Sequence, residues 1–283
     1  MKMKFTAWMI AGIFCVLTAR IPAAESAQFS HAPLDETLKT YVKDGRVDYK
    51  ALKMRQARAD SAGPLSEYID SLGRVPQAEY DAWSETDKIA FWINAYNAIT
   101  LQIIVTNYPI TKMLIPAGIP FPTNSIRQIP GQWDKITHSI MGRKMTLNDI
   151  EHGTLRKLFK EPRIHMALVC AAKGCPPLRG EAYEGSRLNE QLDDQARVYL
   201  TSPAGFKLDA GGKRVSFSAI FQWFSEDFLN VYGDPKEPKW LADKKRAVIA
   251  FASKYVGPQE REFLRKANYQ MSFLSYDWSL NER

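Results

Sequence analysis

The segment from Asp87 to Thr106 constrains the fold of this chain more than any other, because it is apolar nearly all the way round. Ser84 stands three residues before Asp87, a spacing similar to the capping box that opens many helices. Asn107-Tyr108-Pro109 then supplies a stop. A helix that is apolar on every side is a buried helix. The sequence therefore predicts a central helix on which the other elements pack.

Shorter patterned segments lie on both sides of this helix in the sequence. Helices are predicted at Pro33–Val42, Pro64–Leu72, Asn148–Phe159, Leu188–Leu200, Ala219–Leu229 and Asp243–Lys254. Extended structure is predicted at Lys144–Leu147, Ile164–Cys170, Phe206–Phe217 (a hairpin) and Met271–Trp278, and a long loop at Ile110–Gly131. This pattern indicates the α+β class: a helix-rich single domain with a small, mainly antiparallel sheet packed on the buried central helix.

Residues 1–24 have the pattern of a secretory signal peptide. Lys2 and Lys4 precede a fifteen-residue apolar run, Phe5–Ala19, and small residues follow at Ala23-Ala24. The run is shorter than the roughly 18 residues expected of a membrane-spanning helix. We therefore predict cleavage, a periplasmic or secreted protein, and no stable membrane insertion after cleavage. An uncleaved anchor is the alternative.

Residues 29–283 are predicted to form one globular domain. The chain is 45% hydrophobic and 12% aromatic, and it has no internal repeat and no long linker. Its net charge of +7 includes three positive charges within the predicted signal peptide, and it has no run rich in lysine and arginine. Nucleic acid is therefore not a predicted partner. The sequence does not constrain the oligomeric state.

The segment Arg163–Leu178 carries the strongest signal of chemistry. It contains one histidine, His165, and two cysteines, Cys170 and Cys175. The remaining cysteine, Cys15, lies in the predicted signal peptide and would leave with it. Two cysteines in an oxidising compartment often pair, whereas a thiol beside an imidazolium is an activated nucleophile.

The geometry predicted for this segment leaves both outcomes open. If Ile164–Cys170 is a buried strand, its side chains alternate, so His165 and Cys170 point to opposite faces. Cys175 follows a short loop and could return toward either face. It is therefore either a nucleophile beside His165 or the partner of Cys170 in a disulfide.

A thiol–imidazole pair needs a third polar group to fix the tautomer of the histidine. The candidates are Asn94, Glu151 and Asp277. Asn94 and Asn97 lie one turn apart on one face of the predicted central helix, where an unpaired buried amide costs about 1–3 kcal/mol. Either they face a site, where they orient a histidine or bind a substrate carbonyl, or they form hydrogen bonds with the backbone of a neighbouring loop. His165 is likewise either catalytic or a core histidine bonded to a backbone carbonyl.

Five motifs occur in a fixed order along nearly the whole predicted mature chain: G-R-V-D-Y (45–49), A-F-W-I-N-A-Y-N-A (90–98), T-L-N-D-I-E-H-G-T-L-R (146–156), R-I-H-M-A-L-V-C…G-C-P-P-L (163–178) and Y-D-W-S-L-N (276–281). Together they resemble domain-of-unknown-function family 547 (DUF547), found in bacterial envelope proteins and plants. The resemblance implies a papain-like or transglutaminase-like thiol-hydrolase fold, with Cys175 as nucleophile and His165 as catalytic histidine. Those enzymes usually place the cysteine at the start of the central helix, upstream of the histidine. Here the order is reversed, so the arrangement is either permuted or has lost the catalytic cysteine.

A metal site is the third possibility that the sequence raises. His152, His165, Cys170, Cys175 and Glu151 carry suitable donor atoms for zinc. The C-x4-C spacing and the opposite faces of the predicted strand argue against it. The sequence also has no Gly-rich phosphate loop, no G-x-S-x-G elbow and no H-E-x-x-H motif. We therefore predict no metal and no cofactor.

The sequence predicts an exported thiol hydrolase or acyltransferase of papain-like character. It would act on an amide or peptide bond of a peptide or small substrate in the cell envelope. The predicted catalytic residues are Cys175, His165, Asn94 and Glu151. The alternative is a non-enzymatic envelope binding protein, with a structural Cys170–Cys175 disulfide and a cleft for a peptide or small ligand.

Overall fold

The computed structural model describes residues 29–58, 63–111, 121–233, 236, 238–266 and 268–283. The predicted signal peptide lies outside these residues, as does part of the predicted loop Ile110–Gly131. The helices are α1 (Ala32–Tyr41), α2 (Tyr49–Gln56), α3 (Gly63–Arg74), α4 (Gln77–Ala82), α5 (Glu85–Asn107), η1 (Ile126–Gln128), η2 (Asp149–Leu155), α6 (Arg156–Leu158), α7 (Ile164–Ala167), η3 (Gly185–Arg187), α8 (Leu188–Leu200), α9 (Ile220–Trp223), α10 (Ser225–Tyr232), α11 (Asp243–Ala252) and α12 (Pro258–Lys266). The strands are β1 (Val42–Lys43), β2 (Arg46–Val47), β3 (His138–Ile140), β4 (Arg143–Met145), β5 (Phe206–Asp209), β6 (Arg214–Phe217) and β7 (Gln270–Phe273).

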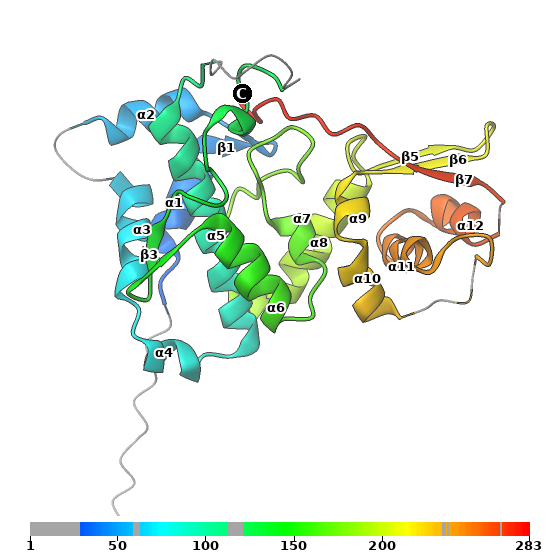
Figure 1. Cartoon of the computed structure of the whole chain (residues 1–283), viewed down its shortest axis with the longest axis horizontal. Helices are drawn as coiled ribbons and strands as arrows, with labels where there is room; N and C mark the ends of the chain where they lie inside the picture. Colours follow the sequence, from blue (N-terminus) through cyan, green and yellow to red (C-terminus); the bar gives the residue numbers. More distant parts are fainter. Residues whose placement is uncertain (1–28, 59–62, 112–120, 234–235, 237, 267) are drawn as a thin grey trace, which may run out of the picture.

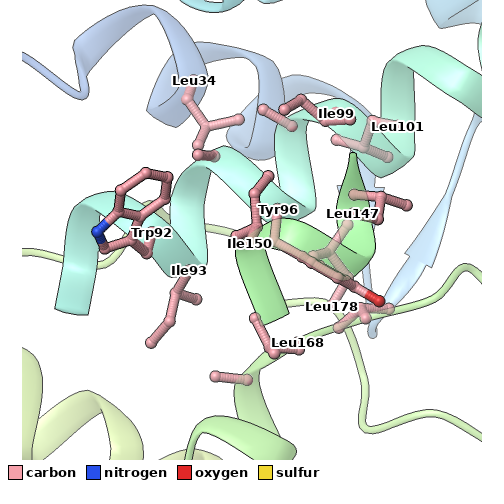
Figure 2. Close-up of a cluster of buried hydrophobic side chains, with 14 of the residues drawn as sticks. Leu34, Trp92, Ile93, Tyr96, Ile99, Leu101, Leu147, Ile150, Leu168 and Leu178 are labelled. Atoms are coloured by element: carbon pink, nitrogen blue, oxygen red, sulfur yellow. The ribbon is translucent and has the colours of Figure 1, made fainter. Parts of the chain in front are cut away.

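The predicted central helix is confirmed as α5. Ser84 caps it, because its hydroxyl oxygen accepts the backbone N–H of Asp87 at 3.1 Å. The helix is long and apolar enough to cross a membrane, yet 89% of its most apolar stretch is buried inside the protein. Figure 2 shows its side chains packed among residues of α1, the 147–150 region and the segment after α7; those labelled are Leu34, Trp92, Ile93, Tyr96, Ile99, Leu101, Leu147, Ile150, Leu168 and Leu178.

The hydrophobic core consists of two clusters, and the α+β class is confirmed. The first cluster surrounds α5. The second lies between α8, the helices α9 to α12 and the three-stranded sheet. Figure 1 shows α9 to α12 and this sheet on the far side of α7 and α8 from α5. Strand β6 pairs antiparallel with β5 and parallel with β7, while β1–β2 and β3–β4 are antiparallel pairs. The three-stranded sheet therefore packs in the second cluster. The sequence had predicted that it would pack on the central helix.

The predicted strand Ile164–Cys170 is wrong. Residues Ile164–Ala167 form one helical turn, α7, in which the backbone N–H of Leu168 bonds to the carbonyl of Ile164 at 2.9 Å. A short apolar run cannot distinguish a buried strand from a buried helical turn, because both are apolar on all sides. The alternation of faces used to separate His165 from Cys170 therefore does not apply.

The side chains of Asn94 and Asn97 form hydrogen bonds with the backbone of neighbouring segments, which is one of the two roles that the sequence left open. The amide of Asn94 bonds to both the carbonyl and the N–H of Tyr183, at 2.7 and 2.9 Å. The amide of Asn97 donates to the carbonyl of Ala167 and accepts from the N–H of Val169, each at 3.0 Å. Because Ala167 is the last residue of α7 and Val169 lies two residues beyond it, these bonds fix the direction in which the chain leaves α7.

Replacing Asn97 with leucine is expected to lower the free energy of unfolding by about 1–3 kcal/mol, because it leaves buried backbone groups unpaired. Urea denaturation followed by circular dichroism measures this change. Asn230 is exposed, so Asn230→Leu is the matched control and should shift stability by less than about 0.5 kcal/mol. An unchanged midpoint and slope for Asn97→Leu would contradict the anchoring role.

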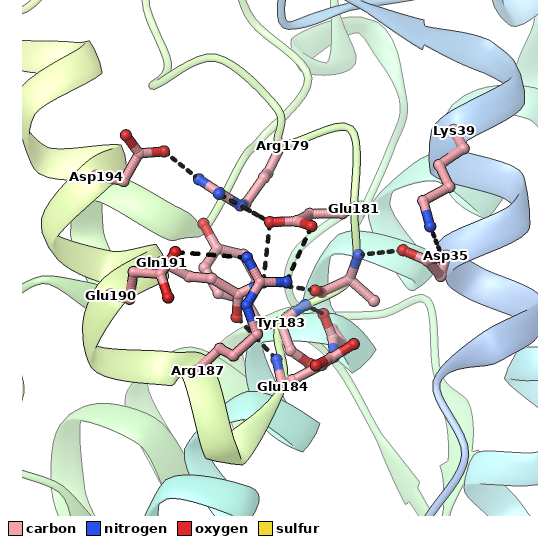
Figure 3. Close-up of polar contacts among 12 residues, drawn as sticks. Asp35, Lys39, Arg179, Glu181, Tyr183, Glu184, Arg187, Glu190, Gln191 and Asp194 are labelled. Carbon is pink, nitrogen blue, oxygen red and sulfur yellow. Dashed lines mark hydrogen bonds and ion pairs between the residues drawn. The ribbon is translucent and has the colours of Figure 1, made fainter.

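The segment that follows Cys175 is held by a polar network. Figure 3 shows Arg179 between Glu181 and Asp194, and Asp35 of α1 bonded to the same loop through the N–H of Ala182. Gln191 of α8 accepts the N–H of Glu184 at 2.9 Å. These contacts attach the loop at residues 179–184 to α1 and α8.

Candidate functional site

A cavity of about 390 Å³ lies where the two hydrophobic clusters meet, with Tyr96 from the first and Ile220 from the second in its wall. Its aromatic lining residues are Tyr96, Trp133, Trp223, Phe224, Tyr276 and Trp278. Its polar and ionisable lining residues are Arg127, Asn148, Glu151, His152, His165, Cys170 and Cys175. Three of the four predicted catalytic residues, Cys175, His165 and Glu151, therefore share one cavity.

The loop that carries the nucleophile candidate is shaped by the end of the chain. We call residues 171–175 the Cys loop and residues 276–281 the C-terminal segment, which runs back from β7 toward β1 (Figure 1). Their backbone hydrogen bonds join Asn281 to Ala171 (3.0 Å), Lys173 to Ser279 (2.8 Å) and Gly174 to Asp277 (2.9 Å). A Cβ at Gly174 would lie 2.9 Å from the backbone nitrogen of Asp277, so the close approach requires glycine there.

Hydrogen-bond donors surround the sulfur of Cys175. The hydroxyl of Tyr276 donates to it at 3.0 Å and the backbone N–H of Cys170 at 3.1 Å. The thiol of Cys170 lies 2.7 Å away. Burial raises the pKa of the Cys175 thiol, but the bonds from Cys170 and Tyr276 outweigh burial and leave this pKa below its usual value. The bond to Cys175, together with burial, raises the pKa of Cys170 well above its usual value. Cys175 is therefore the more acidic thiol of the two.

The two cysteines are free thiols in this structure. Their sulfur atoms lie 2.7 Å apart, beyond the roughly 2.05 Å of a disulfide bond. The disulfide that the sequence left open is thus not formed here. Both cysteines line the same cavity as His165, so Cys170 is not separated from His165 as the strand pattern predicted.

His165 is bonded to an aspartate that the sequence did not single out. Its Nε2 lies 2.7 Å from Oδ2 of Asp227, and its ring stacks on Phe224 with centroids 3.9 Å apart. Arg156 holds the same carboxylate through two bonds, at 2.6 and 2.9 Å. Because Arg156 keeps Asp227 ionised, Asp227 accepts the Nε2 proton and leaves Nδ1 of His165 as the basic nitrogen.

The charges of this pair follow from their surroundings. Burial lowers the pKa of His165 below the usual imidazole value, and Asp227 raises it only in part. Burial raises the pKa of Asp227, but the bonds from His165 and Arg156 lower it far more, so its net pKa lies well below the usual value. At neutral pH the pair is therefore a neutral imidazole on an ionised carboxylate.

Glu151 lines the cavity from η2, a π-helical turn at the start of the helix predicted at Asn148–Phe159. Burial raises the pKa of its carboxyl to about 7, against the opposing effects of the Tyr96 hydroxyl and Arg156. A carboxyl with this pKa exchanges protons near neutrality, as an acid–base group requires. The structure places Glu151 in the cavity wall but does not bond it to His165.

The other candidates for the third group lie elsewhere. Asn94 gives both its amide atoms to the backbone of Tyr183 and does not contact His165, so its predicted catalytic role is corrected to an anchoring one. The carboxylate of Asp277 accepts the N–H of Ser279. The sequence missed Asp227, which lies 62 residues after His165 beside another acidic residue. It also missed Tyr276, although the tyrosine opens one of the recognised motifs.

No hydrogen bond joins His165 to Cys175 within the part of the chain that the structure describes. A proton that moves between them must therefore pass through a substrate atom or a water molecule in the cavity. The structure groups no three His, Cys, Asp or Glu side chains closely enough to hold a metal ion, among the residues that it describes. The chemistry that the site offers is that of a thiol, an imidazole–carboxylate pair and a buried carboxyl.

The fold and the site define an α+β protein with a buried thiol and an aspartate-bound histidine on one cavity. The family model described as "Protein of unknown function, DUF547" matches residues 80–200, which include α5, His165 and both cysteines. This match confirms the resemblance to DUF547 over residues 80–200. No curated protein and no solved structure matches the chain.

Proposed function

We propose that the protein is a thiol hydrolase or acyltransferase of papain-like character that acts on an amide or peptide bond. The observation that carries the proposal is the surroundings of Cys175. Its sulfur lies within hydrogen-bond reach of a hydroxyl, a thiol and a backbone N–H, and Cys175 lines the same cavity as His165, whose ring is bonded to Asp227. Buried structural cysteines do not usually have a lowered pKa, whereas catalytic cysteines do.

The first chemical step is attack of the Cys175 sulfur on the carbonyl carbon of the substrate. An S–C bond forms, and the carbonyl oxygen takes the electron pair of its π bond. Nδ1 of His165 accepts the proton that the thiol loses, through a substrate atom or water in the cavity. The carboxylate of Asp227 stabilises the imidazolium that results, because it already accepts the Nε2 proton at 2.7 Å.

The second step breaks the C–N bond. The imidazolium of His165 returns its proton to the leaving nitrogen, and a thioester on Cys175 remains. Water or another nucleophile then attacks the acyl carbon, the S–C bond breaks, and the sulfur of Cys175 leaves with the electron pair. Attack by water gives an acid, which is hydrolysis, and attack by another nucleophile is acyl transfer. Glu151 is available to exchange a proton with that second nucleophile, since its pKa of about 7 lies near neutrality.

The place of action that we propose is the cell envelope. The support comes from the chain's first residues, where Lys2, Lys4 and the apolar run Phe5–Ala19 match a secretory signal peptide. The substrate that we propose is therefore a peptide or small molecule of the envelope, and we do not propose nucleic acid as a partner.

Alkylation of the native, reduced protein tests the nucleophile directly. Iodoacetamide at pH 7 is expected to modify Cys175 and spare Cys170, because the pKa of Cys175 is lowered and that of Cys170 is raised; peptide mass spectrometry assigns the site. The rate should rise with pH with a midpoint below the roughly 8.5 of a free cysteine. The urea-unfolded protein is the control and should react at both cysteines with an ordinary midpoint. Native protein in which neither thiol reacts after reduction would rule the proposal out.

The alternative is an envelope binding protein that uses the cavity to hold a peptide or small ligand. Its favouring observation is the aromatic lining of the cavity, since such linings are common in binding pockets. This function needs a Cys170–Cys175 disulfide to be the native form. It therefore predicts no free thiol in protein purified from the envelope without reductant.

A further inference from the structure

Arg127 has an unusual position in the cavity wall, because aromatic rings surround its guanidinium. The central carbon of this group lies 4.2 Å from the ring centroid of Phe121, 5.4 Å from Trp133 and 5.2 Å from Trp278. Trp133 and Trp278 line the cavity with Arg127. Cation–π contacts of this kind hold a guanidinium in place without satisfying its N–H donors.

No carboxylate bonds to Arg127 within the described part of the chain. Three other partly buried arginines differ: Arg156 bonds to Asp227, Arg163 to Glu161 and Asp193, and Arg179 to Glu181 and Asp194. Residues 112–120, which lie outside the described part and precede Phe121, contain no Asp or Glu. Burial lowers the pKa of Arg127, and Cys170 is the group that opposes this effect. Among the described residues, Arg127 is thus a cation in the cavity wall to which no carboxylate is bonded.

The local fold fixes Arg127 at this position. The hydroxyl of Ser125 caps η1 and accepts the backbone N–H of Arg127 at 3.2 Å. The side-chain amide of Gln128 holds the carbonyls of Phe121 and Pro122, at 3.2 and 3.1 Å. The carbonyl of Asn124 accepts the N–H of Leu280 at 2.8 Å. The C-terminal segment therefore supports both the Cys loop and the loop that carries Arg127.

We infer that Arg127 binds a carboxylate of the substrate, so the cavity selects amides or peptides that carry a free carboxylate close to the bond attacked. This inference rests on the proposed function and names the substrate class of the same site. A guanidinium matches a carboxylate with two parallel N–H···O bonds. Trp133 and Trp278 then flank the apolar part of the ligand. The unpaired charge in a partly desolvated wall gives such a ligand an advantage over its neutral amide.

Two alkylating reagents of nearly equal size test the inference. Iodoacetate carries a carboxylate and iodoacetamide a neutral amide, and in both cases the sulfur displaces iodide. For the wild type, the ratio of the iodoacetate rate to the iodoacetamide rate at Cys175 should exceed that of glutathione about tenfold or more, as a charge-assisted pair implies. In Arg127→Gln this ratio should fall to that of glutathione. In Arg127→Lys the ratio should lie between these two values, because lysine keeps the positive charge but cannot form two parallel N–H···O bonds with the carboxylate.

Lys173→Gln is the matched control, because Lys173 is an exposed cation on the Cys loop that does not line the cavity. Its ratio should stay within about twofold of the wild type, since exposed charges are largely screened. Circular dichroism and the thermal midpoint establish that each variant is folded. A wild-type ratio equal to that of glutathione, or one that Arg127→Gln leaves unchanged, would overturn the inference.

A second measurement separates this inference from the proposed function. If neither reagent modifies Cys175, the nucleophile proposal fails, and binding of 3-phenylpropionate against 3-phenylpropionamide decides the role of Arg127. Isothermal titration of Cys175→Ala protein should give a tighter Kd for the acid, by about tenfold or more, and Arg127→Gln should remove the difference. Equal affinities for acid and amide would contradict carboxylate recognition, whatever the thiol does.

Discussion

Cys175→Ala is expected to abolish both alkylation at neutral pH and any hydrolytic activity. The reason is that Cys175 supplies the sulfur that forms the thioester. Its sulfur accepts the backbone N–H of Cys170 and lies closer to the Tyr276 hydroxyl than that of Cys170 does, at 3.0 against 3.4 Å. Cys170→Ala is the matched variant: it should keep both properties, with a higher pH midpoint for alkylation because one donor to Cys175 is lost. Timed alkylation with mass spectrometry, at pH 6 to 9, measures the two variants side by side.

A structural disulfide leads to opposite results. The wild type would then resist alkylation until reduced, and either alanine variant would lose similar stability, about 2 kcal/mol from loop-closure entropy for so short a loop. Full activity in Cys175→Ala would exclude the proposed nucleophile under either redox state. Because Cys170→Ala and Cys175→Ala remove the same disulfide but only one nucleophile, the pair of variants separates the two explanations.

The central helix was predictable because its signal is local and long. Ser84 caps it and Pro109 follows its end, and the residues between are apolar on all sides, so burial is the consistent outcome. The helices at α1, α3, α8 and α11 were predicted for similar reasons. The helix predicted at Ala219–Leu229 is divided at Phe224 into α9 and α10. Phe224 is where the ring of His165 stacks, a tertiary contact that no local pattern records.

The seven residues from Ile164 to Cys170 show why the site was only half predictable. Their composition indicated burial correctly, but it did not distinguish a strand from a helical turn. The partner that decides the outcome is Asn97, 70 residues earlier, whose amide takes the backbone bonds of Ala167 and Val169. Residue types therefore identified His165 and Cys175, whereas their orientation depends on long-range hydrogen bonds.

The five motifs acquire a common physical meaning in the structure, because all of them meet around the site. Tyr49 of the first motif bonds through its hydroxyl to Asn281 of the last, at 2.7 Å. Gly45 lies so close to Pro177 that a Cβ would be 2.3 Å from it, and its φ of 74° suits glycine. The second motif supplies Asn97, and the third supplies Glu151. The five motifs, although far apart in the sequence, thus contact one another around the Cys loop and fix its position.

Asp227→Asn is expected to reduce kcat/KM about 10²- to 10⁴-fold, since an amide fixes the wrong tautomer of His165 and does not stabilise its cation. Asp227 also raises the pKa of His165. The acid limb of the pH–rate profile should therefore move to lower pH in the variant. Glu226→Gln is the control, because Glu226 is an exposed neighbour paired with Lys244, and it should leave the profile unchanged. An unchanged profile in Asp227→Asn would show that the pair is only structural.

The same substitution has a pH-dependent effect on stability, and its sign follows from the lowered pKa of Asp227. A carboxyl with a depressed folded-state pKa stabilises the fold fully above the unfolded value, near 3.9, and loses that contribution as the pH falls toward the folded value. Asp227→Asn should therefore be less stable than the wild type at pH 7, by about 1–3 kcal/mol. The difference should shrink steadily below pH about 4. Urea denaturation at pH 7 and pH 3 measures both differences; a gap that persists in acid would mean that packing around His165 and Arg156, and not the charge of Asp227, stabilises this side of the cavity.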